Sequence, residues 1–278
     1  TEYKAGRTPN PDILCNKEIK FKAFLEYAIH LGADYIATGH YVRQRPDTNG
    51  KALLLIGLDT NKDQSYFLAM MTQQQVARAL FPVGEMLKPD VRAVAERHAL
   101  PVADKKDSQG ICFIGAVKMS DFLRHYVPDH PGDIVDTSGK KLGRHQGLHL
   151  YTLGQRKGHG VASPREGMAY VVVGKDINTN RLIVGWDQND SPGLYATTCI
   201  VGTINWINEA VETTRKMEAQ PRYRAKAEPC VVTKISDTQV QVTFQRPQRA
   251  VSPGQICAFY DGGRLLGAGV FEEVRSES

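Results

Sequence analysis

The sequence of 278 residues lacks several features that would mark whole classes of protein. It contains no run of about 18 apolar residues, which argues against a membrane-spanning helix. The first residues do not show the charged and then apolar pattern of a secretory signal, so we expect a cytoplasmic protein. Because 41% of the residues are hydrophobic, the chain can bury more than one core, and its length favours two or three domains.

No Cys-x-x-Cys pair occurs among the five cysteines, which stand at positions 15, 112, 199, 230 and 257. An odd number at such wide spacing fits neither the disulfide scaffold of a secreted domain nor a structural zinc site, so we expect no structural metal. Cys199, Cys230 and Cys257 lie in runs rich in Val, Ile and Phe, where a buried and unreactive thiol is the better interpretation.

Cys15 and Cys112 differ from the other cysteines because loop-forming residues surround them. The two prolines in residues 8–16 fix backbone angles and remove N–H donors, so we expect a held loop that is neither helix nor central strand. Asp12 precedes Cys15 by three residues, and a turn can bring its carboxylate near the thiol. An equally open alternative is that Asp12 caps a helix beginning near Lys17. Cys112 has glycines on both sides, which suits an approachable loop.

The first third of the chain has the pattern of an α/β layer. A helix is predicted over residues 17–31, and a short buried strand over residues 35–38. The apolar stripe of the helix consists of Phe21, Phe24, Leu25, Ala28 and Leu31. Gly39 and His40 follow the strand directly, at the kind of strand end where α/β proteins bind ligands. A lone histidine such as His40 is more often a structural hydrogen-bonding group.

A second strand is predicted over residues 53–58, followed by the polar turn Lys62-Asp63-Gln64. This turn could contact a nucleic acid or cap the helical residues after it, and its composition favours the cap. Helices are predicted over residues 73–80 and 88–99, the second because a proline stands in its first turn.

Acidic residues are absent between positions 137 and 165, although the chain as a whole has 30 of them. The same stretch contains Lys140, Lys141, Arg144, Arg156, Lys157, Arg165, His145, His149 and His159. Such a stretch suits a phosphate backbone, because each neutralised phosphate releases a condensed counterion. A solvated basic surface is the alternative. Residues 152–158 are glycine-punctuated but lack the Lys-Ser/Thr ending of a Walker loop, so they give only a weak signal for ATP.

The remaining sequence is dominated by short β-type runs. Hairpins are predicted at residues 132–139 and 169–184, and the runs at 229–235, 238–244, 255–260 and 264–271 indicate a small closed β-barrel. The segment Gln220-Pro221-Arg222-Tyr223-Arg224 combines cations with an aromatic ring, which suits a phosphate and a stacked base. We therefore predict an α/β part over residues 1–116, a central mainly-β domain over 117–186 and a C-terminal β-barrel over 187–278.

Seven short motifs follow one another along nearly the whole chain. They are TPNPDILCN at 8–16, ATGHY at 37–41, KDQSYFL at 62–68, GICFIG at 110–115, HQG at 145–147, TLGQRKG at 152–158 and RYR at 222–224. In this order they resemble the bacterial tRNA-specific 2-thiouridylases, the MnmA or TrmU family. The resemblance implies that residues 1–116 are part of an adenine-nucleotide α-hydrolase-like PP-loop ATPase domain. It also implies ATP-dependent installation of sulfur at C2 of the wobble uridine in tRNAs for Glu, Gln and Lys.

The resemblance further implies roles for individual residues. Cys112 would carry sulfur as a persulfide, received from a sulfur-relay donor protein downstream of a cysteine desulfurase. Cys15 would be the nucleophile that acts with it, and the two would end as a disulfide. Asp12 would be the acid or base. Contacts to tRNA would come from Asn10, Pro11, Asp12, His40, Lys62, Asp63, Gln64, Arg222, Tyr223 and Gln255. Gly39 would contact ATP, which is expected with Mg²⁺.

One motif of that family is absent: the sequence contains no Ser-Gly-Gly-x-Asp-Ser-Ser loop for the nucleotide. Since the first residue is Thr1, we expect that upstream sequence belongs to the protein, and that this chain binds tRNA weakly and accepts sulfur without efficient adenylation. Two other classes of protein stay open. One is a thiol-disulfide oxidoreductase that uses Cys15 and Cys112, and the other is a non-catalytic RNA-binding module.

Overall fold

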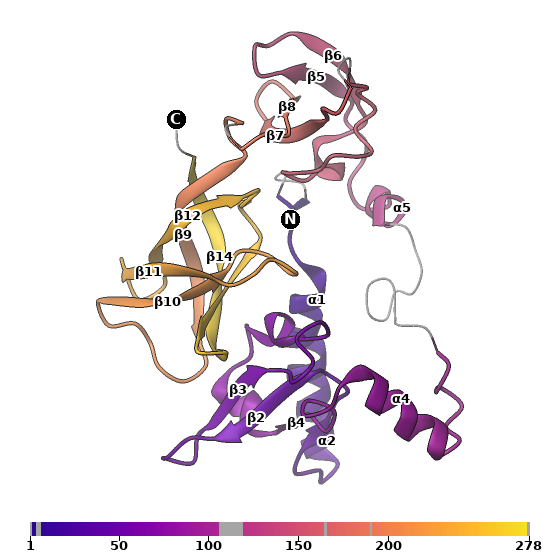
Figure 1. Ribbon diagram of the computed structural model, residues 1–278, viewed down its shortest axis with the longest axis vertical. Coiled ribbons are helices and arrows are strands. Elements are labelled where there is room, and N and C mark those ends of the chain that lie inside the picture. Colours follow the sequence, from indigo (N-terminus) through magenta and orange to yellow (C-terminus); the bar gives the residue numbers. More distant parts are fainter. Residues whose placement is uncertain (1, 4–6, 106–118, 164–165, 190, 277–278) are drawn as a thin grey trace.

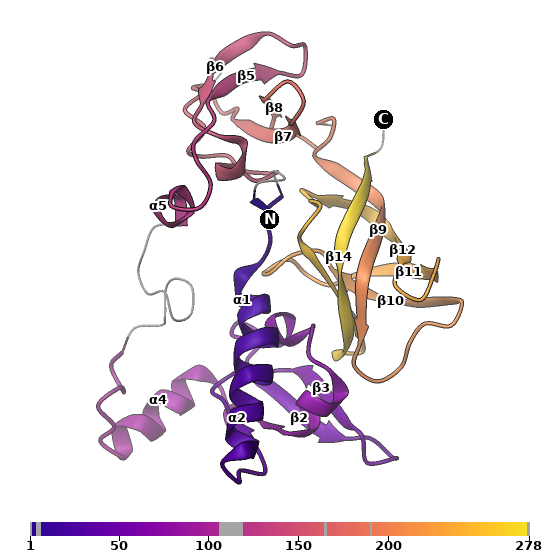
Figure 2. The ribbon, with the colours of Figure 1, turned by 180° about the vertical axis from the view of Figure 1, so that it is seen from behind.

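The computed structural model describes the whole chain except residues 1, 4–6, 106–118, 164–165, 190 and 277–278. An α/β part, a small central sheet and a C-terminal barrel follow in the predicted order, and this fold class is confirmed. The N-terminal segment runs between the central sheet and the barrel before it enters the first helix (Figure 1, and from behind in Figure 2). Among the helices that the structure describes, none has the length and apolar character needed to cross a membrane.

The first helix, α1, covers Pro11–Leu14 and so begins earlier than the sequence pattern predicted. Asn10 caps it, because its Oδ1 accepts hydrogen bonds from the backbone N–H groups of Asp12 and Ile13 at 3.1 and 3.3 Å. Pro11 occupies the first helical position, where its missing N–H is not needed. The predicted loop and the alternative of an Asp12 cap on a helix from Lys17 are therefore both wrong.

The helix continues as the π-helical η2 (Cys15–Phe24) and then as α2 (Leu25–His30). Phe21 and Leu25 are buried in the core as predicted, but Phe24 and Leu31 are 53% and 68% exposed. The i→i+5 hydrogen bonds of a π-helix widen each turn, so a residue three positions after Phe21 leaves its face. The predicted apolar stripe is wrong at Phe24 and Leu31.

A two-stranded parallel sheet lies beside this helix. It pairs β1 (Ile36–Ala37) with β4 (Ala79–Leu80), although β4 lies inside a predicted helix. The helix α3 covers only Gln73–Ala77, because the carbonyl of Arg78 accepts the N–H of Ile36 at 3.0 Å. The helix α4 (Lys88–Arg97) has a proline in its first turn, as predicted.

The antiparallel strands β2 (Val42–Pro46) and β3 (Ala52–Ile56) join the N-terminal part to the barrel. Strand β3 pairs with the barrel strand β14, where Leu54 stands opposite Leu265 and both side chains are fully buried. The 3₁₀-helix η3 (Ser65–Leu68) follows this hairpin. The N-terminal part thus extends the barrel sheet by two strands.

The predicted C-terminal barrel is confirmed and is closed by six strands. They are β9 (Tyr195–Trp206), β10 (Thr214–Gln220), β11 (Glu228–Lys234), β12 (Val240–Arg249), β13 (Ile256–Asp261) and β14 (Arg264–Ser276). The order is β13-β10-β11-β12-β9-β14, and β14 pairs back with β13. Cys199, Cys230 and Cys257 lie in its core as predicted.

The central part is a four-stranded sheet preceded by the short helix α5 (Met119–Arg124). Its strands are β5 (Gly132–Asp136), β6 (Lys141–His145), β7 (Tyr170–Asp176) and β8 (Arg181–Trp186), with the 3₁₀-helix η4 (Leu148–Leu150) between β6 and β7. Both predicted hairpins are present, and the parallel pair β5–β8 joins them into one sheet. Ile134, Leu182 and Val184 form the centre of its own core.

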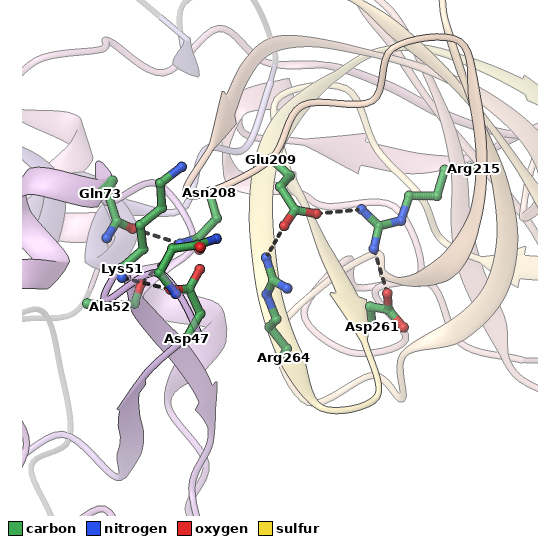
Figure 3. Close-up of polar contacts among 10 residues, drawn as sticks. Asp47, Lys51, Ala52, Gln73, Asn208, Glu209, Arg215, Asp261 and Arg264 are labelled. Atoms are coloured by element: carbon green, nitrogen blue, oxygen red, sulfur yellow. Dashed lines mark hydrogen bonds and ion pairs between the residues drawn. The ribbon is translucent and has the colours of Figure 1, made fainter.

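Polar contacts and a shared core join the N-terminal part to the barrel (Figure 3). Asn208 Nδ2 donates hydrogen bonds to the carbonyl of Ala52 at 3.2 Å and to Oε1 of Gln73 at 3.0 Å. The next residue, Glu209, belongs to an ion-pair network with Arg215, Arg264 and, through Arg215, Asp261. The shared core includes Ile13, Phe21 and Leu54 together with Ile256, Tyr260 and Leu265. The two parts therefore pack as one unit.

Candidate functional site

The turn before α1 is held by both of the other parts of the molecule. The side-chain amide of Gln255, just before β13, donates to the backbone oxygen of Thr8. Thr152 Oγ1 of the central part donates to Thr8 Oγ1 at 3.4 Å. A pocket of about 430 Å³ lies between this turn and the barrel, and its lining includes Pro9, Asn10, Leu14, Thr203, Ile256 and Phe271. Gln255 and Asn10, which were predicted for one site, thus both adjoin the same turn.

Asp12 and Cys15 lie three positions apart on one continuous helix, a spacing that can place two side chains on the same side of a helix. Burial raises the pKa of the Asp12 carboxyl, and Lys20 offsets part of this rise. A carboxyl with a raised pKa is better able to take or give a proton near neutral pH. Cys15 is 7% exposed. Cys112 lies outside the described residues, and no disulfide joins the cysteines that the structure describes.

Asn16, for which no role was predicted, connects the Cys15 helix to the motif at residues 62–68. Its side chain is 4% exposed, and Nδ2 donates to the carbonyl of Phe67 in η3 at 3.3 Å. Such a buried amide fixes the helix start relative to η3. The available signal was its place at the end of the proline-containing motif.

Gly39 and His40 follow β1, but only Gly39 is exposed and has open space around its Cα. His40 is 8% exposed, and its Nδ1 lies 2.9 Å from Oγ1 of Thr38. Its ring packs against Phe21 and Phe81. Burial, with a smaller effect of a nearby lysine, lowers the pKa of His40 to about 4. These contacts fit the structural interpretation of His40, and an RNA contact stays a prediction.

Asp63 holds the turn between β3 and η3. Its Oδ1 accepts the N–H groups of Gly57 and Ser65 at 2.8 and 3.3 Å, and its Oδ2 accepts the Ser65 hydroxyl at 2.7 Å. Burial raises the pKa of Asp63, whereas these hydrogen bonds lower it. The Gln64 side chain accepts the N–H of Tyr41 at 3.0 Å, which joins this turn to the one after β1. The capping interpretation fits these contacts.

The loop between β10 and β11 carries Arg222 and Tyr223. The Tyr223 ring is 36% exposed and lies 4.2 Å from the Phe67 ring, centroid to centroid. The Arg224 guanidinium lies 5.4 Å from the centroid of the Tyr223 ring. Phe67 belongs to the motif at residues 62–68 but was given no role there, and its ring packs against the ring of Tyr223. An aromatic ring fixed in this way and still partly open can stack on a base.

One residue from each of two predicted RNA-contact segments, Asp63 of Lys62–Gln64 and Tyr223 of Arg222–Tyr223, lines one pocket of about 760 Å³. Its lining includes Asp63, Tyr66, Gln220, Tyr223, Arg224 and Tyr260. The structure therefore places part of the predicted residues in two groups, with Asn10 and Gln255 at the turn before α1 and Asp63 and Tyr223 at this pocket. Asn16 and Phe67 connect the two groups.

The basic stretch of the central part is less available than its sequence indicated. Its three histidines, which are His145, His149 and His159, are buried. Burial lowers the pKa of both His145 and His149. Lys141 pairs with Asp133 at 2.7 Å, and Arg156 pairs with Asp187 at 3.1 Å. The histidines thus serve the central core, and part of the positive charge is neutralised.

Among the described residues, no group of three or more His, Cys, Asp or Glu side chains is placed to hold a metal ion.

Three family models match successive parts of the chain. They are the tRNA methyl transferase HUP domain over residues 1–116, the tRNA methyl transferase PRC-barrel domain over 120–186 and the aminomethyltransferase beta-barrel domain over 196–271.

Several similar proteins bear the name tRNA-specific 2-thiouridylase MnmA. The protein from Akkermansia muciniphila is 60% identical over 272 residues, which is 98% of this chain and 75% of that protein. The one from Pseudomonas paraeruginosa is 54% identical over 278 residues, 99% of this chain and 73% of that protein. The one from Pseudomonas fluorescens is 53% identical over 281 residues, 100% of this chain and 74% of that protein. The predicted resemblance is confirmed, and the chain belongs to the MnmA family of tRNA-specific 2-thiouridylases.

Proposed function

We propose that this chain acts in tRNA 2-thiolation, transferring sulfur to C2 of the wobble uridine of tRNAs for Glu, Gln and Lys. Family membership supports the reaction class. The observation that carries the proposal is that Asp63 and Tyr223, which come from two predicted RNA-contact segments distant in sequence, line one pocket together with Arg224. A cation, a partly open tyrosine and polar loops in one place match the chemistry of single-stranded RNA.

Binding of the anticodon loop divides between the two groups of residues. Lys62 and Arg222 neutralise phosphates, and Tyr223 stacks on a base. The wobble uridine leaves its stack easily because anticodon-loop bases are poorly paired, and it enters beside Asn10 and Asp12. Gln255 holds the turn that carries Asn10 through its bond to Thr8.

Sulfur transfer uses the two thiols. A sulfur-relay donor protein places a terminal sulfur on Cys112, giving a persulfide. Asp12 accepts the thiol proton of Cys15, and the Cys15 thiolate attacks Sγ of Cys112. The S–S bond of the persulfide breaks, hydrosulfide leaves, and a Cys15–Cys112 disulfide forms. Hydrosulfide is the nucleophile for C2 of the uridine, and the oxygen that it displaces from C2 would leave with the AMP that ATP supplies on adenylating that oxygen. An external thiol then reduces that disulfide.

Activation of the C2 oxygen requires ATP with Mg²⁺ in this proposal. Of the described residues only Gly39 was predicted for the nucleotide, and the sequence contains no Ser-Gly-Gly-x-Asp-Ser-Ser loop. The described residues thus include no phosphate-binding loop of this kind for ATP. We propose that the 278-residue chain alone binds tRNA and accepts sulfur but does not complete thiolation.

Persulfide labelling with a cysteine desulfurase and radioactive cysteine tests the sulfur-carrying role. The parent chain should take up label, Cys112→Ala should lose it while tRNA binding is unchanged, and Cys199→Ala serves as the matched control. Absence of label in the parent chain would favour the non-catalytic RNA-binding module. Redox cycling of Cys15 and Cys112 with no dependence on RNA would favour the oxidoreductase. ATP-dependent thiolation by this chain would overturn the proposed limit on its activity.

Salt-dependent tRNA binding tests the RNA-contact role. Arg222→Ala should weaken binding and reduce the slope of log affinity against log salt by about 1, as expected for one lost phosphate contact. Arg246→Ala, which removes an arginine from β12 outside both groups, is the control. Equal salt slopes for the parent chain and Arg222→Ala would contradict the assignment.

A further inference from the structure

A series of three linked hydrogen bonds, of which the middle one is buried and the outer two are partly buried, runs from the N-terminal part into the barrel. Ser65 Oγ donates to Oδ2 of Asp63 at 2.7 Å and lies 3.1 Å from the hydroxyl of Tyr260. The Tyr260 hydroxyl donates to Oε1 of Gln220 at 3.1 Å. This hydrogen-bond series thus crosses from the turn after β3 through β13 to the end of β10.

Gln220, at the barrel end of this hydrogen-bond series, holds the loop that carries Arg222 and Tyr223. Gln220 Nε2 donates to the carbonyl of Ala225 at 2.8 Å, and the N–H of Ala225 donates to the carbonyl of Arg222 at 3.2 Å. The side-chain amide of Gln220 therefore closes the base of the loop. Both of its polar ends are engaged, one toward Tyr260 and one toward Ala225.

The middle of this hydrogen-bond series is buried, which restricts the geometry that its partners can adopt. Ser65 is fully buried and Tyr260 is 4% exposed. Polar groups buried in this way lose the full strength of their hydrogen bonds when a partner is removed or displaced, because water does not replace it. The neighbouring Tyr66 adds a second anchor, since its hydroxyl donates to the carbonyl of Ile256 at 2.9 Å.

We propose that Ser65, Tyr260 and Gln220 are positioning residues that hold the Lys62–Gln64 turn and the Arg222–Tyr223 loop in one fixed arrangement, so that a single RNA engages both. Ser65 and Tyr260 were not predicted to contact RNA, and Gln220 was predicted only as part of the segment 220–224 that suits a phosphate and a stacked base. The inference rests on the proposed function, because that function assigns RNA contacts to the two segments. Fixing two contact segments in advance raises the effective concentration of the second once the first is bound.

Tyr260→Phe tests this inference because it removes one oxygen from the middle of the hydrogen-bond series and keeps the ring in the core. Its matched control is Tyr195→Phe at the start of β9, which removes a phenolic hydroxyl that donates a hydrogen bond to Oδ1 of Asn189. Amide hydrogen exchange is measured without RNA. The amides of residues 222–226 should exchange faster in Tyr260→Phe than in the parent chain, and should be unchanged in Tyr195→Phe.

The RNA measurement uses Lys62→Ala, Arg222→Ala and their double variant in both backgrounds. In the parent background the double variant should lose less affinity for tRNA than the product of the two single losses. In the Tyr260→Phe background the losses should multiply, and Tyr260→Phe itself should bind about threefold more weakly or worse. Thermal unfolding of every variant checks that each is folded at the assay temperature.

The possible outcomes separate the two proposals. Unchanged exchange in residues 222–226 together with unchanged coupling in Tyr260→Phe overturns the positioning role. A parent chain that binds tRNA no better than an unrelated hairpin RNA overturns the proposed function, whereas faster exchange of the loop in Tyr260→Phe still supports the role of Tyr260 in holding it.

Discussion

Burial decides which individual titratable groups of this protein can take part in chemistry near neutral pH. Burial raises the pKa of the Cys199 and Cys230 thiols to about 12 and that of Cys257 well above its ordinary value. Only a thiolate is a good nucleophile, so these three cysteines are inert in the folded protein. Burial also raises the pKa of the Asp12 carboxyl, which favours a role for Asp12 in proton transfer with Cys15.

Thiol labelling with peptide mapping by mass spectrometry checks the three barrel cysteines. In native protein at about pH 8, Cys199, Cys230 and Cys257 should stay unmodified, because a thiol with a pKa near 12 is almost wholly protonated there. Addition of denaturant should expose all three to the reagent. Rapid labelling of any of them in the native protein would contradict this expectation.

His40 should make the stability of the protein fall in acid. Its pKa drops from 6.5 to about 4 on folding, so the unfolded chain binds the proton more tightly within this range. The free energy of unfolding therefore falls as the pH decreases from 6.5 toward 4. The contribution of this one group between about pH 7 and 5 is about 2 kcal/mol. In urea unfolding, His40→Asn should lose correspondingly less free energy of unfolding between about pH 7 and 5 than the parent chain. An identical loss of free energy in parent and variant would contradict the assignment.

At the scale of single elements, local signals predicted those elements whose ends are set by nearby residues. Pro89 in the first turn predicted α4, and alternating Val and Ile runs predicted the barrel strands. The start of α1 was missed because Pro11 was taken as a loop residue, although proline is also favoured at the first helical position. Of the pair β1–β4, the strand at residues 35–38 was predicted but β4 was not, because the pairing depends on a partner distant in the sequence.

The candidate site shows the same division between local and distant signals. Ordered motifs predicted residues such as Asn10, Asp63 and Tyr223, and the structure gathers these residues in two groups. Asn16 and Tyr260 were not predicted, because their importance lies in contacts with residues far along the chain. The sequence does not indicate which distant residue a buried hydroxyl or amide will bond to.

The N-terminal cap on α1 should contribute measurably to stability. Asn10→Ala removes the acceptor for two backbone N–H groups and should lower the free energy of unfolding by about 1 kcal/mol. Asn10→Asp keeps an acceptor at the same position and is the matched control. Denaturant unfolding compares the two variants. Equal losses in both would show that the cap is not the cause.

At the scale of the whole molecule, the N-terminal part and the barrel share a core and one continuous sheet, whereas the central sheet has a core of its own. Leu265 of β14 lies in the shared core opposite Leu54 of β3. Loosening that point should therefore disturb both parts. The central sheet should respond separately, because cores without common residues are expected to unfold with more independence.

Leu265→Ala and Leu182→Ala form a matched pair that tests this arrangement, since both leucines are fully buried. Each substitution should lower the free energy of unfolding by about 2–5 kcal/mol through lost burial and a residual cavity. Hydrogen exchange should distinguish them. Leu265→Ala should speed exchange in β3 as well as in β13 and β14, while Leu182→Ala should affect β5, β7 and β8 and leave β3 unchanged. If Leu265→Ala left exchange in β3 at the parent rate, the N-terminal part and the barrel would be separate folding units, and the fixed arrangement of the two RNA-contact segments would need another cause.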